Sequence, residues 1–205
     1  MWISEGFVCG TSGELEEIGK DYYDELIQRN LIEPYGMTID QTICNMHDVV
    51  RSFAQYVARS EALVAQSSET DISDKLNSQK FIRLSLVTRG SESNEVEWCT
   101  LQARTSLRTL IIDGGIKLKP GDSLVAFSNL RTLSVEGGEF DALAESLYQL
   151  KHLRYLSLDC TKTSKLPESI GKMKLLQHIS LLLCDRLSKL PSSITKATEL
   201  EISST

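Results

Sequence analysis

The second half of the chain repeats one pattern at a constant step. The segments "LRTLIIDGG", "LRTLSVEGG", "LRYLSLDCT" and "LQHISLLLC" begin at Leu107, Leu130, Leu153 and Leu176, each 23 residues after the one before. An earlier copy, "FIRLSLVTR", begins at Phe81. Repeats of this length each form one small unit that stacks on its neighbours, so this half is predicted to fold as a solenoid.

Each copy follows the pattern LxxLxL, and the copy from Leu176 extends it to LxxLxLxxCxxL through Cys184 and Leu187. This is the leucine-rich repeat, in which a unit of about 20 to 29 residues contributes one short strand and a looser return segment. The chain is therefore predicted to contain an α/β solenoid of about five repeats over residues 81–205. The closing "TELEISST" lacks a clean LxxLxL and makes a poor capping repeat, so we expect a truncated array.

Side chains alternate between two faces along a strand, so the fourth and sixth positions of every copy point inward together. We expect these residues to stack into one continuous core, because no copy can bury its apolar face alone. They are Leu110, Ile112, Leu133, Val135, Leu156, Leu158, Ile179 and Leu181. Leu166, Ile170, Leu190 and Ile194, in return segments that carry Pro167 and Pro191, are predicted to pack beneath the strands.

The fifth and seventh positions point outward and form the face that such solenoids usually offer to partners. The candidate residues for protein recognition are Ser134, Ser157 and Ser180 at the fifth position and Asp113, Glu136 and Asp159 at the seventh. Adjacent strands lie about 4.8 Å apart, so the three carboxylates would form an acidic row. This row is either a stripe of solvated charge or a recognition stripe for a basic surface, and the sequence leaves both open.

The first half begins with an amphipathic helix. In "TSGELEEIGKDYYDELIQRN", Thr11 and Glu14 have the spacing of a capping box, and apolar residues recur at helical spacing behind them. Pro34 and Gly36 then predict a turn, and the β-branched content of residues 37–46 predicts a strand.

A second helix is predicted in "DVVRSFAQYVARSEALV", with Asp48 as its N-cap and Val49, Val50, Phe53, Val57 and Ala58 at helical spacing. Helix, turn, strand and helix fit a small winged-helix domain over residues 1–65. The polar residues 66–80 are predicted to be a linker. The fold class is thus α+β, a winged helix followed by a leucine-rich-repeat solenoid.

Charge and composition exclude several classes of function. The net charge of −6 and the many acids on the first predicted helix argue against a grip on nucleic acid phosphates. The five cysteines are widely spaced with no CxxC pair, which argues against a zinc or redox site. No secretory signal or membrane-spanning stretch is recognisable, so we expect a cytoplasmic protein.

Together these segments resemble the plant nucleotide-binding leucine-rich-repeat (NLR) disease-resistance proteins, most closely the coiled-coil class. "WISEGFV" resembles the opening of the family's winged helix, "MHDVVRSFAQYVA" its MHD motif, and "KLPESIGKMKLLQ" the start of its repeat array. The resemblance covers essentially the whole chain. It implies a role in innate immunity, with the winged helix acting in the NB-ARC nucleotide switch and the repeats recognising a pathogen effector or a guarded host protein.

In that family, Met46, His47 and Asp48 would match the motif that closes over bound ADP. The resemblance implies that His47 approaches the β-phosphate and holds the resting state. An imidazole suits this role because it donates hydrogen bonds and titrates near neutrality. The resemblance also implies an intramolecular contact with an upstream nucleotide-binding domain, and ADP or ATP as the nucleotide of the full-length receptor.

No GxxxxGK[ST] phosphate loop occurs in the chain, since "GELEEIGKD" has one residue too many between its glycines. We therefore expect a C-terminal, non-enzymatic fragment that binds nucleotide weakly or not at all by itself. The alternative is a stand-alone repeat scaffold or decoy that modulates full-length receptors. A hydrolase using His47 and Asp48 is disfavoured, because adjacent residues at a strand-to-helix junction usually point apart and no nucleophile accompanies them.

Overall fold

A computed structural model of the protein describes residues 1–11, 13–34, 44–66, 72–88, 97–114, 118–196 and 201–203. The chain divides into two compact units, Met1–Ser60 and Glu61–Thr205. We call them the N-terminal unit and the solenoid.

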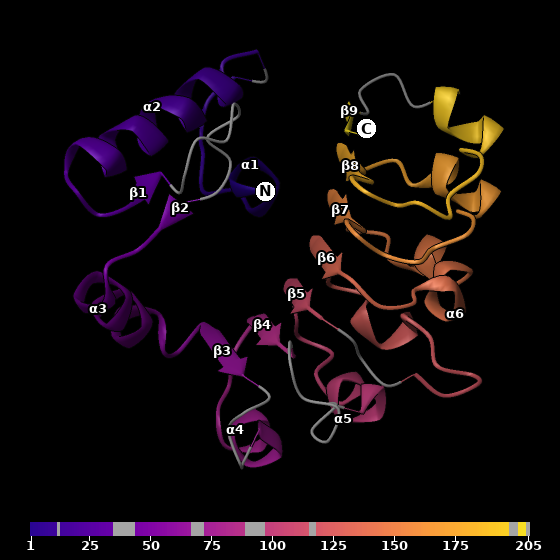
Figure 1. The fold of residues 1–205 in the computed structure, drawn as a ribbon, viewed down its shortest axis with the longest axis horizontal. Coiled ribbons are helices and arrows are strands. Elements are labelled where there is room, and N and C mark those ends of the chain that lie inside the picture. The colour runs from indigo at the N-terminus through magenta and orange to yellow at the C-terminus, as the bar shows by residue number, and fades with distance from the viewer. Residues whose placement is uncertain are drawn as a thin grey trace. The chain divides into compact units, whose positions relative to one another are not determined.

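The N-terminal unit has the elements of a winged helix (Figure 1). Its helices are α1 (Trp2–Glu5), α2 (Leu15–Gln28) and α3 (Asp48–Ala58), and its strands are β1 (Glu33–Pro34) and β2 (Cys44–Asn45). The strands pair antiparallel, with Glu33 opposite Asn45. Of the strand predicted over residues 37–46, the structure places two residues in β2, while residues 37–43 and Gly36 lie outside the described ranges.

Both predicted helix caps differ in the structure. The Thr11 hydroxyl donates to the Glu14 carboxylate at 2.7 Å, and Glu14 itself takes the N-cap position of α2 without a side-chain cap bond. His47, not Asp48, is the N-cap of α3, because its extended backbone precedes the helix and its carbonyl accepts the Arg51 N–H at 2.8 Å. Asp48 is the first helical residue, where a negative charge still favours the helix dipole.

The solenoid is built on one parallel sheet of seven strands in chain order (Figure 1). They are β3 (Ala62–Gln66), β4 (Arg83–Val87), β5 (Thr109–Asp113), β6 (Thr132–Glu136), β7 (Tyr155–Ser157), β8 (His178–Ser180) and β9 (Glu201–Ser203). The five predicted copies supply β4 to β8. β3 and β9 are additional strands, so the array is longer at both ends than the repeat pattern indicated.

Short helices form the return segments opposite the sheet (Figure 1). The α-helices are α4 (Ile72–Ser78), α5 (Trp98–Gln102) and α6 (Asp141–Ala144). The 3-10 helices are η1 (Val125–Phe127), η2 (Leu147–Gln149), η3 (Glu168–Lys172) and η4 (Ser192–Lys196).

The boundary between the units differs from the predicted one. Residues 62–66 do not continue the preceding helix, which ends at Ala58; they form β3, which pairs with β4. The predicted linker contains α4, whose Ile72 and Leu76 are buried in the solenoid core. A sheet edge and two buried apolar side chains attach this segment to the repeats, and the boundary lies at residues 60 and 61.

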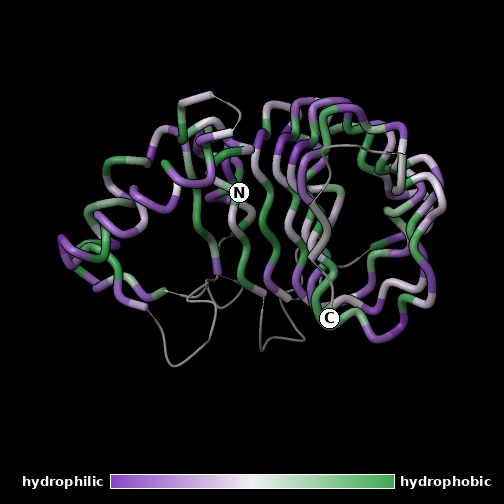
Figure 2. Tube along the Cα trace, turned by 90° about the horizontal axis from the view of Figure 1, so that it is seen from above, coloured by the Kyte–Doolittle hydropathy of each residue, from purple (hydrophilic) through white to green (hydrophobic). Residues whose placement is uncertain are grey.

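The inward positions form the core as predicted. Leu110, Leu133, Leu156 and Ile179 align in register across β5 to β8, and none exposes more than 1% of its surface. In the tube of Figure 2 the longest hydrophobic stretches lie in strands, while other strands and the return segments are of mixed character. Beneath the strands, Leu166, Ile170 and Ile194 are buried as expected.

Leu190 departs from the prediction, with 42% of its surface exposed. A leucine in this row is covered by the return segment of the following coil. No return segment that the structure describes follows η4 to cover it.

Polar side chains also connect successive coils. The Glu168 carboxylate accepts the backbone N–H groups of Ser192 and Ser193, each at 3.0 Å. The Asp141 carboxylate accepts the N–H and hydroxyl of Ser164 at 2.9 and 2.7 Å. In both cases one carboxylate satisfies polar groups of the next return segment that would otherwise depend on water.

Truncation of the stacked core provides a direct test of it. Leu156→Ala leaves a cavity between β6 and β8, so we expect the free energy of unfolding to fall by about 2 to 5 kcal/mol. Leu190→Ala removes the same atoms from an exposed site and should cost well under about 1 kcal/mol. Urea unfolding of the whole chain compares the two variants, and equal losses would contradict a continuous leucine core.

The Glu168 contact predicts a dependence of stability on pH. The N–H bonds from Ser193 and Ser192 hold the pKa of Glu168 below its ordinary value of 4.5. A carboxyl whose pKa is lower in the folded state stabilises the fold above its unfolded pKa and loses that effect as pH falls through the folded pKa. Glu168→Gln should therefore be less stable than the parent above pH 4.5, and the difference should shrink below it. Glu139→Gln, at an exposed position, is the control and should show no such convergence.

Candidate functional site

The segment Met46, His47 and Asp48 lies at the start of α3. Met46 is half-buried, while His47 and Asp48 are exposed. Arg51 holds this segment from the first turn of the helix: its guanidinium donates to the Met46 carbonyl at 3.1 Å and lies 3.5 Å from the Asp48 carboxylate. The role of Arg51 was not predicted, although its spacing of three residues from Asp48 on a helix is the signal that indicates such a pair.

The imidazole of His47 makes no hydrogen bond or ion pair with the described residues. The backbone of His47, in contrast, is fixed. Its carbonyl accepts the Arg51 N–H, and the Arg51 side chain contacts the neighbouring residues Met46 and Asp48. The side chain thus lies at a defined place, with both ring nitrogens without a partner among the described residues. It can donate a hydrogen bond to a phosphate, but by itself it provides one contact only.

α3 carries an apolar face that is exposed in the described part of the N-terminal unit. Val49, Phe53, Tyr56 and Val57 recur at helical spacing, and each exposes more than 60% of its surface. No residue of α3 is buried. An amphipathic helix normally places such a stripe against a core, so this one is available for a partner. We call these four residues the α3 face.

The predicted recognition residues on the sheet differ in their exposure. Asp113 and Glu136 are neighbours by register, and Ser134 lies beside Ser157, as expected. Ser157 and Ser180 are buried, with 3% and 4% of their surface exposed. This corrects their assignment as outward contact residues.

Asp159 explains that burial. Its carboxylate accepts the hydroxyl of Ser157 at 2.8 Å, the hydroxyl of Ser180 at 2.7 Å and the Leu182 N–H at 2.8 Å. The residue therefore bridges the coils of β7 and β8 rather than contributing a free charge to the acidic row. Period-two alternation predicts the side of the sheet on which a side chain lies, but not the polar groups of the next coil that meet it there.

Tyr155 and His178 form a stacked pair beside this network, with ring centroids 4.9 Å apart and planes inclined by 10°. Burial, with a smaller effect of Asp159, raises the pKa of Tyr155. The pair was not predicted as part of the outward face. The third position of each copy points the same way as the fifth and seventh, so the alternation itself would have identified it.

The described ranges contain neither a metal-binding cluster nor a membrane-spanning helix. No group of three or more His, Cys, Asp or Glu side chains there could hold a metal ion. None of the helices in those ranges combines the length and the apolar character needed to cross a bilayer.

Two family models match the chain. A model of the disease resistance protein winged helix domain matches residues 1–54, and a model of the leucine-rich repeat region matches residues 106–202. No curated protein matches. Among solved structures, a leucine-rich-repeat protein of Leptospira interrogans superposes with a TM-score of 0.41 at 12% identity, covering 88% of this chain and 56% of that one. The chain thus spans about half the length of that protein.

Replacing Asp159 separates a structural role from a recognition role. Asp159→Ala leaves three donors without their acceptor, so we expect a loss of about 1 to 3 kcal/mol in the free energy of unfolding. Asp185→Ala, at an exposed position in the following coil, should change it by less than about 0.5 kcal/mol. Urea unfolding measures both, and an unchanged stability of Asp159→Ala would return this residue to the recognition surface.

Proposed function

The chain carries, in order, the winged-helix and leucine-rich-repeat modules of plant NLR-type disease-resistance proteins, and from this premise we propose that it is the regulatory and recognition part of such a receptor. In this proposal the N-terminal unit closes on a separate nucleotide-binding domain, and His47 contacts the phosphate of the ADP held there. The repeats bind a protein, either a pathogen effector or a host protein that the receptor monitors.

The α3 face is the observation that supports this proposal most. It begins one turn or less from His47, so a domain that covers the face would also meet the imidazole. The N-terminal unit also lacks a core of its own: Val8 and Ile32 are its only buried hydrophobic residues in the described ranges. A unit of this size with so little buried apolar surface gains stability from a partner.

The nucleotide would be held mainly by the partner domain. The sequence contains no phosphate loop, and a single histidine cannot replace a cradle of backbone N–H groups. We therefore propose that the chain has no catalytic activity of its own and binds ADP only together with the nucleotide-binding domain. The cytoplasmic location expected from the sequence belongs to the same proposal.

The experiment has two stages. Calorimetry of the chain with ADP alone should detect no binding at sub-millimolar nucleotide. A nucleotide-binding domain of an NLR-type receptor, supplied separately with ADP bound, should release ADP more slowly when the chain is added. With His47→Ala, the factor by which the chain slows ADP release should be about tenfold smaller. This corresponds to the loss of one hydrogen bond to a charged group. His152→Ala is the matched control on the solenoid, and tight binding of ADP by the chain alone would overturn the proposal.

A substitution on the α3 face tests the docking step separately. Phe53→Glu should abolish association with the nucleotide-binding domain, because it places a charge in the centre of the apolar contact. Its thermal midpoint should stay unchanged, since 67% of Phe53 is already exposed. Val125→Glu, on an exposed residue of the solenoid, is the matched control. Association that survives Phe53→Glu would exclude the α3 face as the contact.

A further inference from the structure

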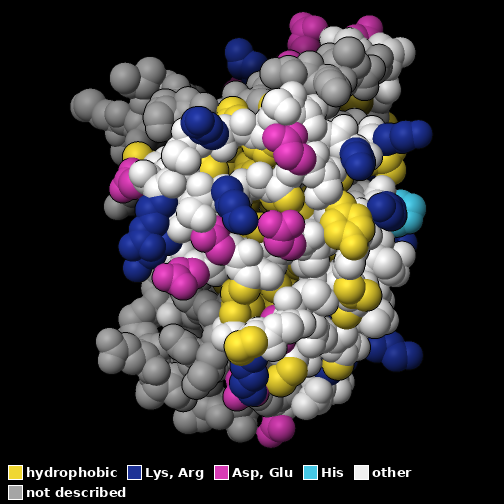
Figure 3. Space-filling model, turned by 90° about the vertical axis from the view of Figure 1, so that its right-hand side faces the viewer, with side chains coloured by type: hydrophobic (Ala, Val, Ile, Leu, Met, Phe, Trp, Pro, Cys, Tyr) yellow, Lys and Arg dark blue, Asp and Glu magenta, His cyan; other side chains and the backbone are white. Residues whose placement is uncertain are grey.

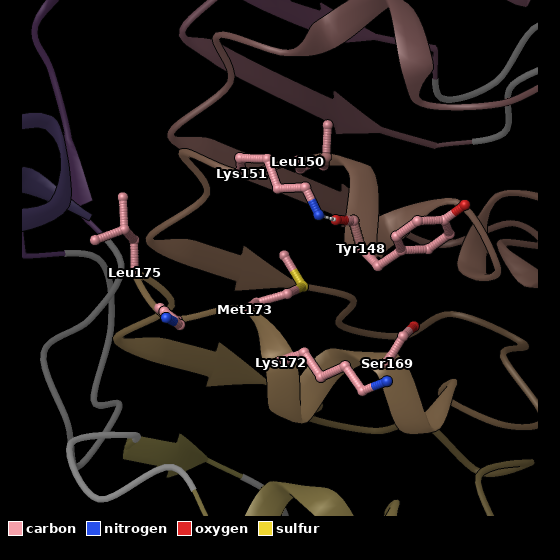
Figure 4. A pocket seen from close by; sticks show the side chains of 8 residues that line it. Tyr148, Leu150, Lys151, Ser169, Lys172, Met173 and Leu175 are labelled. Carbon is pink, nitrogen blue, oxygen red and sulfur yellow. Dashed lines mark hydrogen bonds between the residues drawn. The ribbon is translucent and has the colours of Figure 1, made fainter.

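The return-segment side of the solenoid holds a pocket of about 630 Å³ between two successive coils (Figure 4). Tyr148, Leu150 and Lys151 come from η2 and the residues that follow it, and Ser169, Lys172 and Met173 come from η3 and its end. This volume is in the range that holds a small organic ligand.

The pocket is cationic in a protein that is acidic overall. Lys151, Lys172 and Lys174 line it together with no carboxylate, although the net charge of the chain is −6. Figure 3, which shows the return-segment side, has basic, acidic and hydrophobic side chains mixed over the surface. The absence of acids from the pocket lining is therefore local to this site.

The three ammonium groups differ in how they are held. Lys151 donates to the Tyr148 carbonyl at 2.7 Å and lies 5.4 Å from the centre of the Tyr148 ring, so it is positioned while keeping two N–H donors. Lys172 and Lys174 make no hydrogen bond or ion pair with any described residue. Their charges are available to an anion.

The repeat places two of these lysines on neighbouring coils. Lys151 and Lys174 are 23 residues apart and occupy the same position in successive coils. Both side chains are exposed, as is that of Lys172, so their charges are accessible from solvent. No acid of the pocket lining neutralises them.

The remaining lining suits a ligand with an apolar part. Leu175 exposes 44% of its surface, and the half-buried Met173 points between the two coils (Figure 4). The Ser169 hydroxyl has no hydrogen-bond partner among the described residues and faces the same space. A phosphate carries up to two negative charges and three acceptor oxygens, which matches several ammonium groups and a hydroxyl better than a single carboxylate does.

We propose that this pocket binds a small phosphate monoester whose organic part is apolar. The phosphate lies among Lys151, Lys172 and Lys174, and the apolar part contacts Met173 and the Tyr148 ring. The source of the phosphate is either a soluble ester or the headgroup of an anionic lipid, which share this chemistry. The site is independent of the nucleotide contact proposed for His47.

Titration of the chain with phenyl phosphate tests the site. The ¹³C-labelled methyl group of Met173 serves as a local NMR probe, and its resonance is assigned by its absence from the spectrum of Met173→Leu. We expect this methyl resonance to shift with a saturable profile at low salt, and benzoate to bind at least about fivefold more weakly. The Lys172→Gln, Lys174→Gln double variant should weaken binding by about tenfold or more. Lys189→Gln, an exposed lysine outside the pocket, should leave the affinity unchanged.

Vesicles of phosphatidylcholine, with and without phosphatidic acid, separate the two sources. Binding to phosphatidic acid vesicles that the double lysine variant abolishes supports a lipid headgroup, and binding of phenyl phosphate alone supports a soluble ester. No shift of the Met173 methyl with either probe overturns the proposal. An equal loss of affinity in Lys189→Gln overturns it as well, because the attraction would then come from general surface charge.

Discussion

The solenoid depends on one constraint: a single coil cannot bury its own apolar face. The inward aliphatic side chains of β4 to β8 pack against the coils on either side as well as against the return segments, so each layer stabilises its neighbours and the array folds as one cooperative stack. The parallel ladder adds backbone bonds between coils. It extends past the strands, because Gly114, Gly137 and Cys160 donate to the carbonyls of the next coil at 2.8 to 3.0 Å. Everything displayed on either face of the sheet takes its position from this stack.

The parts that could be predicted from the sequence are those governed by periodicity. The step of 23 residues and the alternation within LxxLxL indicated the parallel sheet, its register and its core, since a strand buries every second residue. The same reasoning did not find β3, because "EALVAQ" suits a helix and a strand equally and follows a true helix. It also did not find α4, where only Ile72 and Leu76 face the core within a polar segment. Here burial depends on the neighbouring coil, which the local pattern does not contain.

The candidate sites were predicted in part for a related reason. Local sequence predicted that His47 lies at the start of a helix, but it predicted Asp48 as the N-cap. Side-chain preference alone does not determine which residue is the last one with non-helical backbone angles before the helix. Asp159 was predicted to contribute a charge to the outward face, yet it accepts one hydrogen bond from Ser157 of its own coil and two from Ser180 and Leu182 of the next coil. A residue with positive φ follows several strands. In two copies it is a glycine, which indicates this conformation from the sequence, whereas Cys160 and Leu183 adopt it without a glycine to indicate it.

The two units therefore contribute different physical properties to the receptor. The solenoid holds its side chains through many mutually supporting contacts, so it can present a fixed surface to a protein and a fixed pocket to a small ligand. The N-terminal unit has two buried apolar residues in its described part and an open helix face beside His47. In the function proposed above, a domain that docks on this unit would also stabilise its fold, because folding and docking would draw on the same contacts. The proposed nucleotide-dependent switch requires such coupling, and the few buried apolar residues of this unit are the property on which the proposal rests.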